Sequence, residues 1–460
     1  MRVLLVVHDC NAPYNVFPYG IGYLAAAMRN AGHKVAIYDQ AITHASTEDL
    51  YAYIRNEPRF DMIGMGFQAA YFHVCYEVAQ TIKKACGAIP FVLGGSAPSA
   101  SPEYFLDKFN ADYVLVGEAE NSINKLLKII EGKEDPQSVP GLYWRAGEEI
   151  RHSLKIPPPE NLDDLSFPAW DLFDMQSYTF PRRQAGVDHL CRAFGMLTTR
   201  GCPYACKFCF RLEPGFRMRS KENVIEELKY LIGKYNVNFV SFHDDLFMAS
   251  KKRTLDMCEA FLESGLKFNW LCNGRFNIAD NEQLKIMRKS GCVLISYGLE
   301  SGDQKILNEM DKRITVQQMY EVARLTKEEG ILVTVPAMFG LPGETKESIH
   351  KTVDVILATT SFHDKRTLRP MQPYPGSFYY RDCVQKGLLK DENDFYGRYF
   401  SSEKWTVNLS DIHSEELDKV VFEANERLLR AHFERELEDH LNMFRNVYFA
   451  HDAMSFIPMR

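Results

Sequence analysis

Three cysteines within eight residues limit the structures open to this chain, because one loop must bring their thiols together. Cys202, Cys206 and Cys209 occur in the segment 198–209, TTRGCPYACKFC, with three and then two residues between them. Thiolates this close can bind one soft metal centre, and a cubane iron–sulfur cluster normally takes four ligands. A cluster bound here would therefore keep one iron open for another ligand.

A structural zinc site is the alternative for this segment. Such sites close with four ligands, commonly at paired C-x-x-C spacings, and the chain has no second C-x-x-C pair. Cys191 or His189 could still supply a fourth ligand. Most of the other cysteines are scattered along apolar stretches, where we expect small core residues rather than disulfides. This pattern favours a reducing cytoplasm.

The composition is that of a large globular protein. The 460 residues suffice for about two or three domains, with 46% hydrophobic and 25% charged residues. A formal net charge of −7 and the lack of a Lys/Arg-rich block argue against nucleic acid as a partner. The apolar run at residues 1–7 is too short for a secretory or membrane-spanning segment, so we expect a buried strand and no membrane span.

Residues 1–135 alternate strand-like and helix-like segments. A helical stretch at 20–30 separates the first two strands, and such spacing predicts a parallel sheet covered on both faces. The architecture expected here is a doubly wound, Rossmann-like α/β domain. The predicted strands lie at 3–7, 34–38, 61–67, 91–93 and 113–116.

Glycine-rich loops follow three of these strands. In a doubly wound sheet the ligand binds outside the carboxyl ends of the strands, and glycines there let the backbone approach it closely. No GxGxxG follows the first strand, which lowers the case for NAD or FAD, and each glycine could also be an ordinary turn residue. The candidate ligand-binding residues are Gly66, Gln68, Gly94, Gly95, Ser96, Gly117 and Glu118.

The rest of the chain divides into three parts. Prolines interrupt residues 136–190, which we expect to form a semi-rigid connector. Residues 191–383 alternate β and α segments and predict a partial or full (β/α) barrel, with its reactive groups at the carboxyl ends of the strands. Residues 384–460 are aromatic at first and then helical over 414–446; we expect mostly packing contacts there, and the choice of substrate if any region sets it. The predicted barrel strands are 195–199, 239–242, 268–272, 293–297 and 331–338.

Polar residues end the predicted barrel strands. Asp244 and Asp245 follow the second strand, Arg275 follows the third, and Glu300 and Ser301 follow the fourth. A pair of acids suits a cationic amino group, and an arginine can hold a carboxylate with two donors. Two alternatives stay open, namely solvated acids on a surface loop and a structural ion pair between Arg275 and Glu300.

The cysteine segment resembles the cluster loop of the radical S-adenosylmethionine (SAM) enzymes. The order of the other motifs is similar to that of the subfamily with an N-terminal cobalamin-binding domain, the class B methyltransferases. The loops 94–99 and 117–120 depart from the usual GGxxPT and GEGE, and no DxHxxG supplies a histidine below cobalt. The matching segments are 18–25 (PYGIGYLA), 94–99 (GGSAPS), 117–120 (GEAE), 243–247 (HDDLF), 298–302 (GLESG), 339–345 (FGLPGET) and 373–377 (PYPGS).

The resemblance implies three cofactors. The three cysteines would hold a 4Fe-4S cluster, and the seven loop residues of the first domain would bind cobalamin. SAM would chelate the open iron and lie against the polar residues at the ends of the barrel strands. Those residues are Asp244, Asp245, Arg275, Glu300 and Ser301.

The resemblance also implies a reaction. It is the methylation of an unactivated carbon centre through a 5'-deoxyadenosyl radical and methylcobalamin. Cyclisation or rearrangement without methyl transfer is an alternative in the same family, as is an N-terminal domain that binds no cobalamin. A non-catalytic cobalamin or zinc sensor is the alternative from another class. The expected partners are a small-molecule or lipid substrate and a low-potential flavodoxin or ferredoxin.

Overall fold

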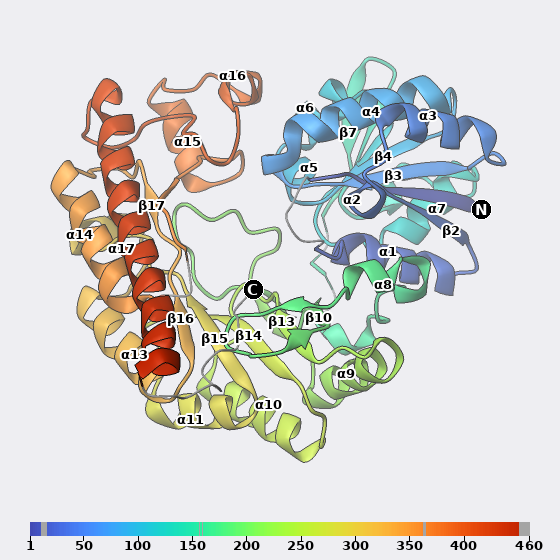
Figure 1. Ribbon diagram of the computed structural model, residues 1–460. Helices are drawn as coiled ribbons and strands as arrows, with labels where there is room; N and C mark the ends of the chain where they lie inside the picture. The colour runs from blue at the N-terminus through green and yellow to red at the C-terminus, as the bar shows by residue number, and fades with distance from the viewer. Residues whose placement is uncertain (11–15, 156, 159, 362–364, 450–460) are drawn as a thin grey trace.

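Two α/β units lie side by side, each with a sheet at its centre and helices outside (Figure 1). The structure is a computed structural model that describes residues 1–10, 16–155, 157–158, 160–361 and 365–449. A long loop from the green part of the chain lies between the two units and carries the three cysteines.

The first unit is a seven-stranded sheet in the order β2-β1-β3-β4-β5-β6-β7. Its first five strands run parallel: β1 (Arg2–Val7), β2 (Lys34–Asp39), β3 (Met62–Gly66), β4 (Phe91–Gly94) and β5 (Tyr113–Leu115). Its helical elements are α1 (Tyr19–Asn30), α2 (Gln40–Thr43), α3 (Thr47–Asn56), η1 (Ala69–Tyr71), α4 (Phe72–Cys86), α5 (Ser96–Ala100), α6 (Pro102–Lys108) and α7 (Ile123–Ile130).

Alternating side chains of β1 show that both faces of this sheet are covered. Val3, Leu5 and Val7 belong to the core that includes residues of α1 and α7. Leu4 and Val6 belong to the core on the other face, with residues of α3, α4 and α6. Successive side chains of a strand point to opposite faces, so the predicted doubly wound architecture is confirmed.

The expected connector contains a hairpin that belongs to the first sheet. Strands β6 and β7 pair with each other antiparallel, and β6 pairs antiparallel with β5. The prediction of a spacer over the whole of 136–190 is therefore wrong for this part, because Leu142 and Trp144 alternate with more exposed residues and enter the core. The elements of this region are η2 (Pro136–Ser138), β6 (Leu142–Ala146), β7 (Glu149–His152), η3 (Leu162–Asp164), η4 (Trp170–Leu172), α8 (Met175–Tyr178), β8 (Arg182–Arg183) and β9 (Leu190–Cys191).

Aromatic side chains after the hairpin join the two units through one core. The rings of Trp170 and Phe173 each lie 4.6 Å from the ring of Phe17, which precedes α1. Phe194 of the second sheet lies 5.4 Å from the same ring. Large aromatic rings supply much apolar area, so this cluster fixes the first unit against the second instead of spacing them apart.

The second unit is a five-stranded parallel sheet in the order β10-β13-β14-β15-β16. It forms a partial barrel that continues into the parallel pair β17–β18 through a bridge between Glu300 and Ala337. Its strands are β10 (Ala193–Met196), β13 (Phe239–Phe242), β14 (Asn269–Gly274), β15 (Cys292–Tyr297), β16 (Leu332–Thr334), β17 (Met338–Phe339) and β18 (Arg369–Pro370). A small hairpin, β11 (Thr199–Gly201) and β12 (Phe216–Met218), flanks the cysteine loop.

Helices follow the strands of this barrel. They are α9 (Lys221–Tyr235), α10 (Lys251–Glu263), α11 (Asn281–Lys289), α12 (Gln304–Glu309), α13 (Val316–Glu328) and α14 (Lys346–Thr359). The single strand expected at 331–338 is divided into β16 and β17. Pro336, which has no N–H to donate, lies between them, and its carbonyl accepts from the amides of Leu299 and Glu300.

The C-terminal region returns to both units. Helices α15 (Phe378–Gln385) and α16 (Glu392–Arg398) lie against the first unit, where the ring of Tyr396 stacks 4.0 Å from that of Phe72. Helix α17 (Ser414–Phe449) runs along α14. The aromatic stretch therefore has the packing role expected for it. No helix within the described residues is both long and apolar enough to cross a bilayer.

Glu344 is a buried acid in the turn between β17 and α14, and it gives a pH-dependent prediction. One carboxylate oxygen accepts the amides of Gly340 and Leu341, whereas Oε1 has no partner among the described residues. Burial raises the pKa of Glu344 from 4.5 to about 8. The folded state therefore binds this proton more tightly than the unfolded chain does. Its contribution to stability is full below about pH 4.5 and is lost as the pH rises through about 8.

The Glu344→Gln variant should flatten that pH dependence, because the amide stays neutral. Relative to the wild type, its loss of stability between about pH 5.5 and about pH 8.5 should be smaller by about 1 kcal/mol or more. The measurement is the midpoint of urea unfolding at the two pH values. Equal pH dependence in both proteins would contradict the role given to Glu344.

Candidate active site

The cysteine loop leaves the carboxyl end of β10 and is closed by the β11–β12 hairpin. Cys206 is 8% exposed, Cys202 is half-buried and Cys209 lies at the surface of the loop. Burial raises the pKa of the Cys202 thiol, so metal binding must displace a proton there. No three His, Cys, Asp or Glu side chains of the described residues are already gathered round a metal position. The donor set nevertheless fits a cluster: three thiols on one loop, close enough for their charges to interact.

Arg275 lies against this loop from the carboxyl end of β14. Its Nη1 is 3.9 Å from Sγ of Cys206, and its guanidinium lies 3.7 Å over the ring of Tyr204. The side chain is only 5% exposed, yet Nε and Nη2 have no hydrogen-bond partner in the part of the chain that the structure describes. Buried donors are nearly always paired, so this geometry fits an anionic ligand beside Cys206.

Asp244 follows β13, as the sequence predicts, but its side chain points into the protein. It is fully buried, and Oδ1 accepts the amides of Thr198 (2.6 Å) and Thr199 (2.9 Å), while Oδ2 accepts the Thr198 hydroxyl. Arg253 donates to the same hydroxyl at 2.6 Å. The carboxylate is therefore bound by the polypeptide at the start of the cysteine loop, and its contact with SAM stays a prediction.

Asp245 is the acid of this pair that remains open. Its side chain is exposed at the strand end, and its charge acts on the Cys202 thiol, which places the two groups close together. Partial burial and the charge of Asp244 raise the pKa of Asp245. A cationic group near Asp245 would favour its charged form and offset this rise in pKa, which agrees with the predicted contact with an amino group.

Glu300 pairs with a residue that the sequence did not single out. Its Oε1 lies 2.7 Å from Nζ of Lys312, which comes from the turn between α12 and α13, and both side chains are nearly buried. The alternative of an Arg275–Glu300 pair is therefore not what the structure shows. The pair covers Gly298, and Lys312 lies 5.6 Å over the ring of Phe208 in the cysteine loop. Glu300 and Lys312 thus remain at the site, as an ion pair.

Ser301 is turned into the protein. Its hydroxyl is fully buried, accepts the amide of Asp303 at 3.2 Å and lies 3.4 Å from the hydroxyl of Thr352. These contacts hold the start of α12 against α14. The hydroxyl of Ser301 thus has partners within the fold, and its contact with SAM stays a prediction.

Five of the predicted cobalamin residues lie together at the carboxyl ends of β3 and β4. The two strand ends touch: a Cβ on Gly66 would lie 3.6 Å from the carbonyl oxygen of Gly94, and one on Gly95 would lie 2.8 Å from the backbone of Phe67. Gly95 also has a φ of +91°, which favours glycine. The glycines thus allow the two strand ends to approach each other closely, and the contact of this edge with cobalamin stays a prediction. The edge contains Gly66, Gln68, Gly94, Gly95 and Ser96.

The loop after β5 differs from the other two. Gly117 donates its amide to the Ser99 hydroxyl at 2.9 Å, and Glu118 forms ion pairs with Arg200 and Arg217 of the hairpin beside the cysteines. The carboxylate of Glu118 is thereby occupied. The partners of Glu118 lie in the second unit, and its contact with cobalamin stays a prediction.

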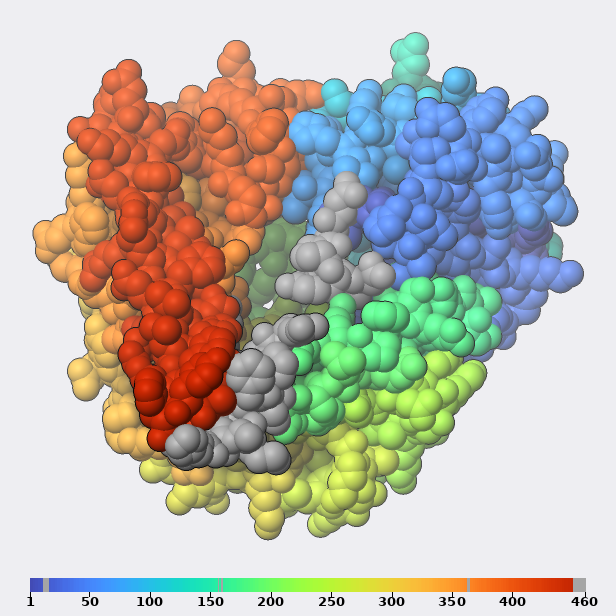
Figure 2. Space-filling model, viewed as in Figure 1, coloured from blue at the N-terminus to red at the C-terminus, as the bar shows by residue number. Residues whose placement is uncertain are grey.

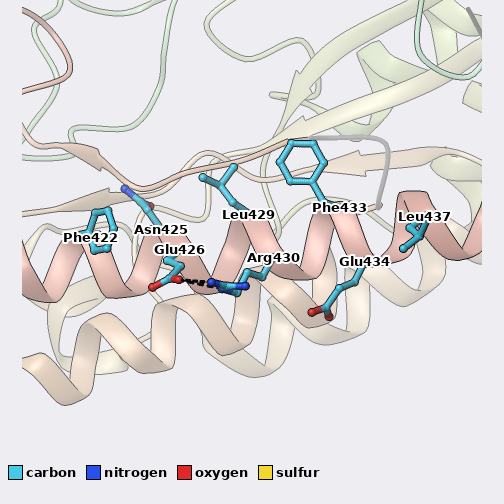
Figure 3. A pocket seen from close by; sticks show the side chains of 8 residues that line it. All are labelled: Phe422, Asn425, Glu426, Leu429, Arg430, Phe433, Glu434 and Leu437. Atoms are coloured by element: carbon cyan, nitrogen blue, oxygen red, sulfur yellow. Dashed lines mark hydrogen bonds and ion pairs between the residues drawn. The ribbon is translucent and has the colours of Figure 1, made fainter.

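The space between the units is open. In Figure 2 the molecule is hollowed in its centre, and green atoms from the region of residue 200 lie deep between the blue first unit and the orange C-terminal elements. A separate groove of about 520 Å³ follows α17 (Figure 3). It is lined by that helix alone and contains none of the residues discussed above, so we do not regard it as the active site.

Comparisons with known proteins agree with this division. The model of the B12 binding domain matches residues 7–127, and that of the Radical SAM superfamily matches residues 196–356. An uncharacterized methyltransferase of Pyrococcus horikoshii is 27% identical over 88% of this chain and 86% of its own. An anaerobic magnesium-protoporphyrin IX monomethyl ester cyclase of Cereibacter sphaeroides is 28% identical over 73% of this chain and 55% of its own.

Two solved structures have the same fold. The radical SAM methyltransferase TsrM from Kitasatospora setae, with cobalamin and a 4Fe-4S cluster bound, has a TM-score of 0.68 at 19% identity and covers 84% of this chain and 75% of its own. The cobalamin-dependent radical enzyme OxsB has a TM-score of 0.70 at 15% identity, over 99% of this chain and 73% of its own. With its cysteine loop and its two matched domains, the chain belongs to the radical SAM enzymes that carry a B12-binding domain.

Proposed function

We propose that this protein methylates an unactivated carbon atom of a small-molecule substrate, with a 4Fe-4S cluster, SAM and cobalamin as cofactors. The two matched domains and the relative named as a methyltransferase, which is similar along most of both chains, support this reaction. When bound, these cofactors supply the deoxyadenosyl radical and the methyl group. The protein binds and orients them and the substrate.

The unpaired guanidinium of Arg275 carries this proposal. A buried arginine with two unpartnered nitrogens is costly unless a ligand accepts from them. Because Nη1 already lies beside Sγ of Cys206, the acceptor belongs next to the cluster loop. The carboxylate of SAM has the charge and the planar shape that the free edge of Arg275 requires. Asp245, also open, is suited to the amino group of the same ligand.

The hollow between the units suits the substrate. A carbon-centred radical must be kept from water, so the substrate has to fill the space between the cysteine loop and the edge of β3 and β4. Orange atoms of the C-terminal elements border this hollow in Figure 2. We therefore assign the choice of substrate to the region after residue 383, although its aromatic residues near Phe72 serve packing.

Ring closure is the second candidate reaction. A relative named as a cyclase is similar to this chain over 348 residues, but the match covers only 55% of that protein. The methyltransferase of Pyrococcus horikoshii is matched over 86% of its length. The fuller match favours methylation.

A low-potential flavodoxin or ferredoxin would supply the electron, and the eleven free cysteines suit a reducing cytoplasm.

The products of anaerobic turnover test the proposed reaction. The protein is reconstituted with iron, sulfide and cobalamin, and SAM and a strong reductant are added. Mass spectrometry should then detect both 5'-deoxyadenosine and S-adenosylhomocysteine, the second only when cobalamin is present. Deoxyadenosine alone would point to cyclisation or rearrangement. Neither product, with one zinc and no iron bound, would favour a sensor. Cys206→Ala is the control and should abolish cluster loading and both products.

Arg275→Gln should weaken SAM binding without emptying the cluster site. The amide cannot hold a carboxylate with two charged donors, so the Kd for SAM should rise about 10-fold or more. Arg275→Lys keeps the charge but loses the planar fork, so its Kd for SAM should lie between those of the wild type and Arg275→Gln. The measurement is SAM binding to the cluster-loaded protein, with iron content as the control. An unchanged Kd in both variants would contradict the role of Arg275.

Asp244 and Asp245 should respond differently to substitution. Asp245→Ala should weaken SAM binding with the iron content intact. Asp244→Ala leaves two buried amides and a hydroxyl without their acceptor, so it should destabilise the loop and lower iron incorporation, at a cost of about 2 kcal/mol or more in stability. Iron content and SAM binding are measured for both variants. Equal loss of iron in the two would remove the distinction between them.

A further inference from the structure

Two arginines flank the cysteine loop, and both reach into the first unit. Arg200 of β11 directly precedes Gly201 and Cys202, and its two terminal nitrogens are used separately. Nη1 lies 2.7 Å from Oε2 of Glu118, and Nη2 lies 2.7 Å from Oε1 of Glu120. One planar guanidinium thus joins two carboxylates of the loop after β5 to the residue that begins the cysteine loop.

Arg217 of β12 completes this arrangement from the other strand of the hairpin. Its Nη1 lies 3.2 Å from Oε2 of Glu118, and its Nη2 contacts Oε1 of the same carboxylate. The side chains of all four residues are nearly buried, that of Glu118 being 8% exposed. Burial alone would raise the pKa of Glu118, but Arg217 and Arg200 outweigh it and hold that pKa below its ordinary value. We call Arg200, Arg217, Glu118 and Glu120 the interdomain clamp.

Further contacts fix the clamp in place. The guanidinium of Arg200 lies 4.8 Å over the ring of Tyr23 in α1. Glu213, on the segment that returns from the cysteines to β12, accepts the amide of Glu118 at 3.2 Å and pairs with Lys155 at 2.9 Å. A Cβ on Gly117 would lie 2.0 Å from Oε1 of Glu213, and the φ of Gly117 is +84°. The loop after β5 is therefore shaped to receive the cysteine loop.

We propose that the interdomain clamp positions the cluster loop against the B12-binding domain, so that Glu118 and Glu120 act on the SAM site and not on cobalamin. The inference rests on the proposed function, because it concerns the loop that holds the cluster. Buried ion pairs that share one planar guanidinium are held in a single geometry, whereas the side chains of exposed ion pairs are held less firmly. The loop is thereby held at both strands of its hairpin. Its thiols therefore stay at a fixed distance from Arg275.

The test compares Glu118→Gln and Glu120→Gln with the wild-type protein. The matched control is Glu328→Gln, which breaks an exposed ion pair with Arg324. Each protein is reconstituted anaerobically with iron, sulfide and hydroxocobalamin. The measurements are the Kd for cobalamin by absorbance, the Kd for SAM, and the change that SAM causes in the EPR spectrum of the reduced cluster.

In the Glu118→Gln variant the Kd for SAM should rise about 10-fold, with a broadened EPR response to SAM, while the Kd for cobalamin stays within about threefold of the wild type. Glu120→Gln, which removes one contact of Arg200, should act in the same direction more weakly. The control should match the wild type. If instead cobalamin binding weakens about 10-fold and the SAM readouts do not change, Glu118 is a cobalamin residue and the inference is overturned. No change in any readout would overturn it as well.

Hydrogen exchange provides a readout that needs no cofactor. The amides of Thr199–Gly201 and Phe216–Met218 should exchange faster in Glu118→Gln than in the wild type, with α4 unaffected. Arg200→Lys keeps the charge but cannot join two carboxylates, so it should have the same effect. It replaces Glu118→Gln as the test variant if Glu118→Gln does not fold. Unchanged exchange in both variants would contradict the clamp. A wild-type protein that takes up no cluster would instead refute the proposed function.

Discussion

A buried carboxylate fixes the point from which the cysteine loop leaves the barrel. Asp244 follows β13, the neighbour of β10 in the sheet, and accepts the amides of Thr198 and Thr199 where the chain leaves β10. A carboxylate without water is tolerated only when its oxygens are satisfied, and here the Thr198 hydroxyl donates to the second oxygen. Arg253 donates in turn to that hydroxyl. The contact that allows this acid to be buried therefore also sets the direction of the three cysteines.

Two arginines beside the loop differ in whether their nitrogens have hydrogen-bond partners within the protein. This difference separates a structural group from a candidate ligand-binding group. Both are largely buried and both border the cysteines. The terminal nitrogens of Arg200 donate to Glu118 and Glu120, so this side chain holds the protein together. Arg275 has Nε and Nη2 without a partner in the described chain, so it needs an acceptor from outside. Because an unpaired buried donor is costly, the two unpaired nitrogens of Arg275 beside the cysteine loop favour a ligand that accepts from them.

Periodicity predicted the elements better than the roles of single residues. The strand Phe239–Phe242 has the predicted bounds, and the helix Tyr19–Asn30 agrees closely with the helical stretch predicted at 20–30, since both follow from local apolar spacing. The β6–β7 hairpin was missed because the surrounding prolines hid its alternation. At the site, the sequence located the polar strand ends but not their partners. Ser301 binds the start of α12, and Lys312 reaches Glu300 from a turn that carries no motif. Such pairings depend on tertiary structure, which a strand-end pattern does not specify.

Two segments that resemble cofactor motifs, 18–25 and 117–120, contact the second unit. In the segment 18–25, Tyr19 lies so close to Gly195 of β10 that a Cβ there would be 1.8 Å from its hydroxyl, and Tyr23 supports Arg200. A methyl group or a hydrogen atom moves efficiently only between partners held near contact distance, and water must be excluded while it moves. Residues that join the two domains therefore bear on the reaction without touching a cofactor. A motif common to such proteins can therefore reflect alignment of the two domains rather than contact with cobalamin.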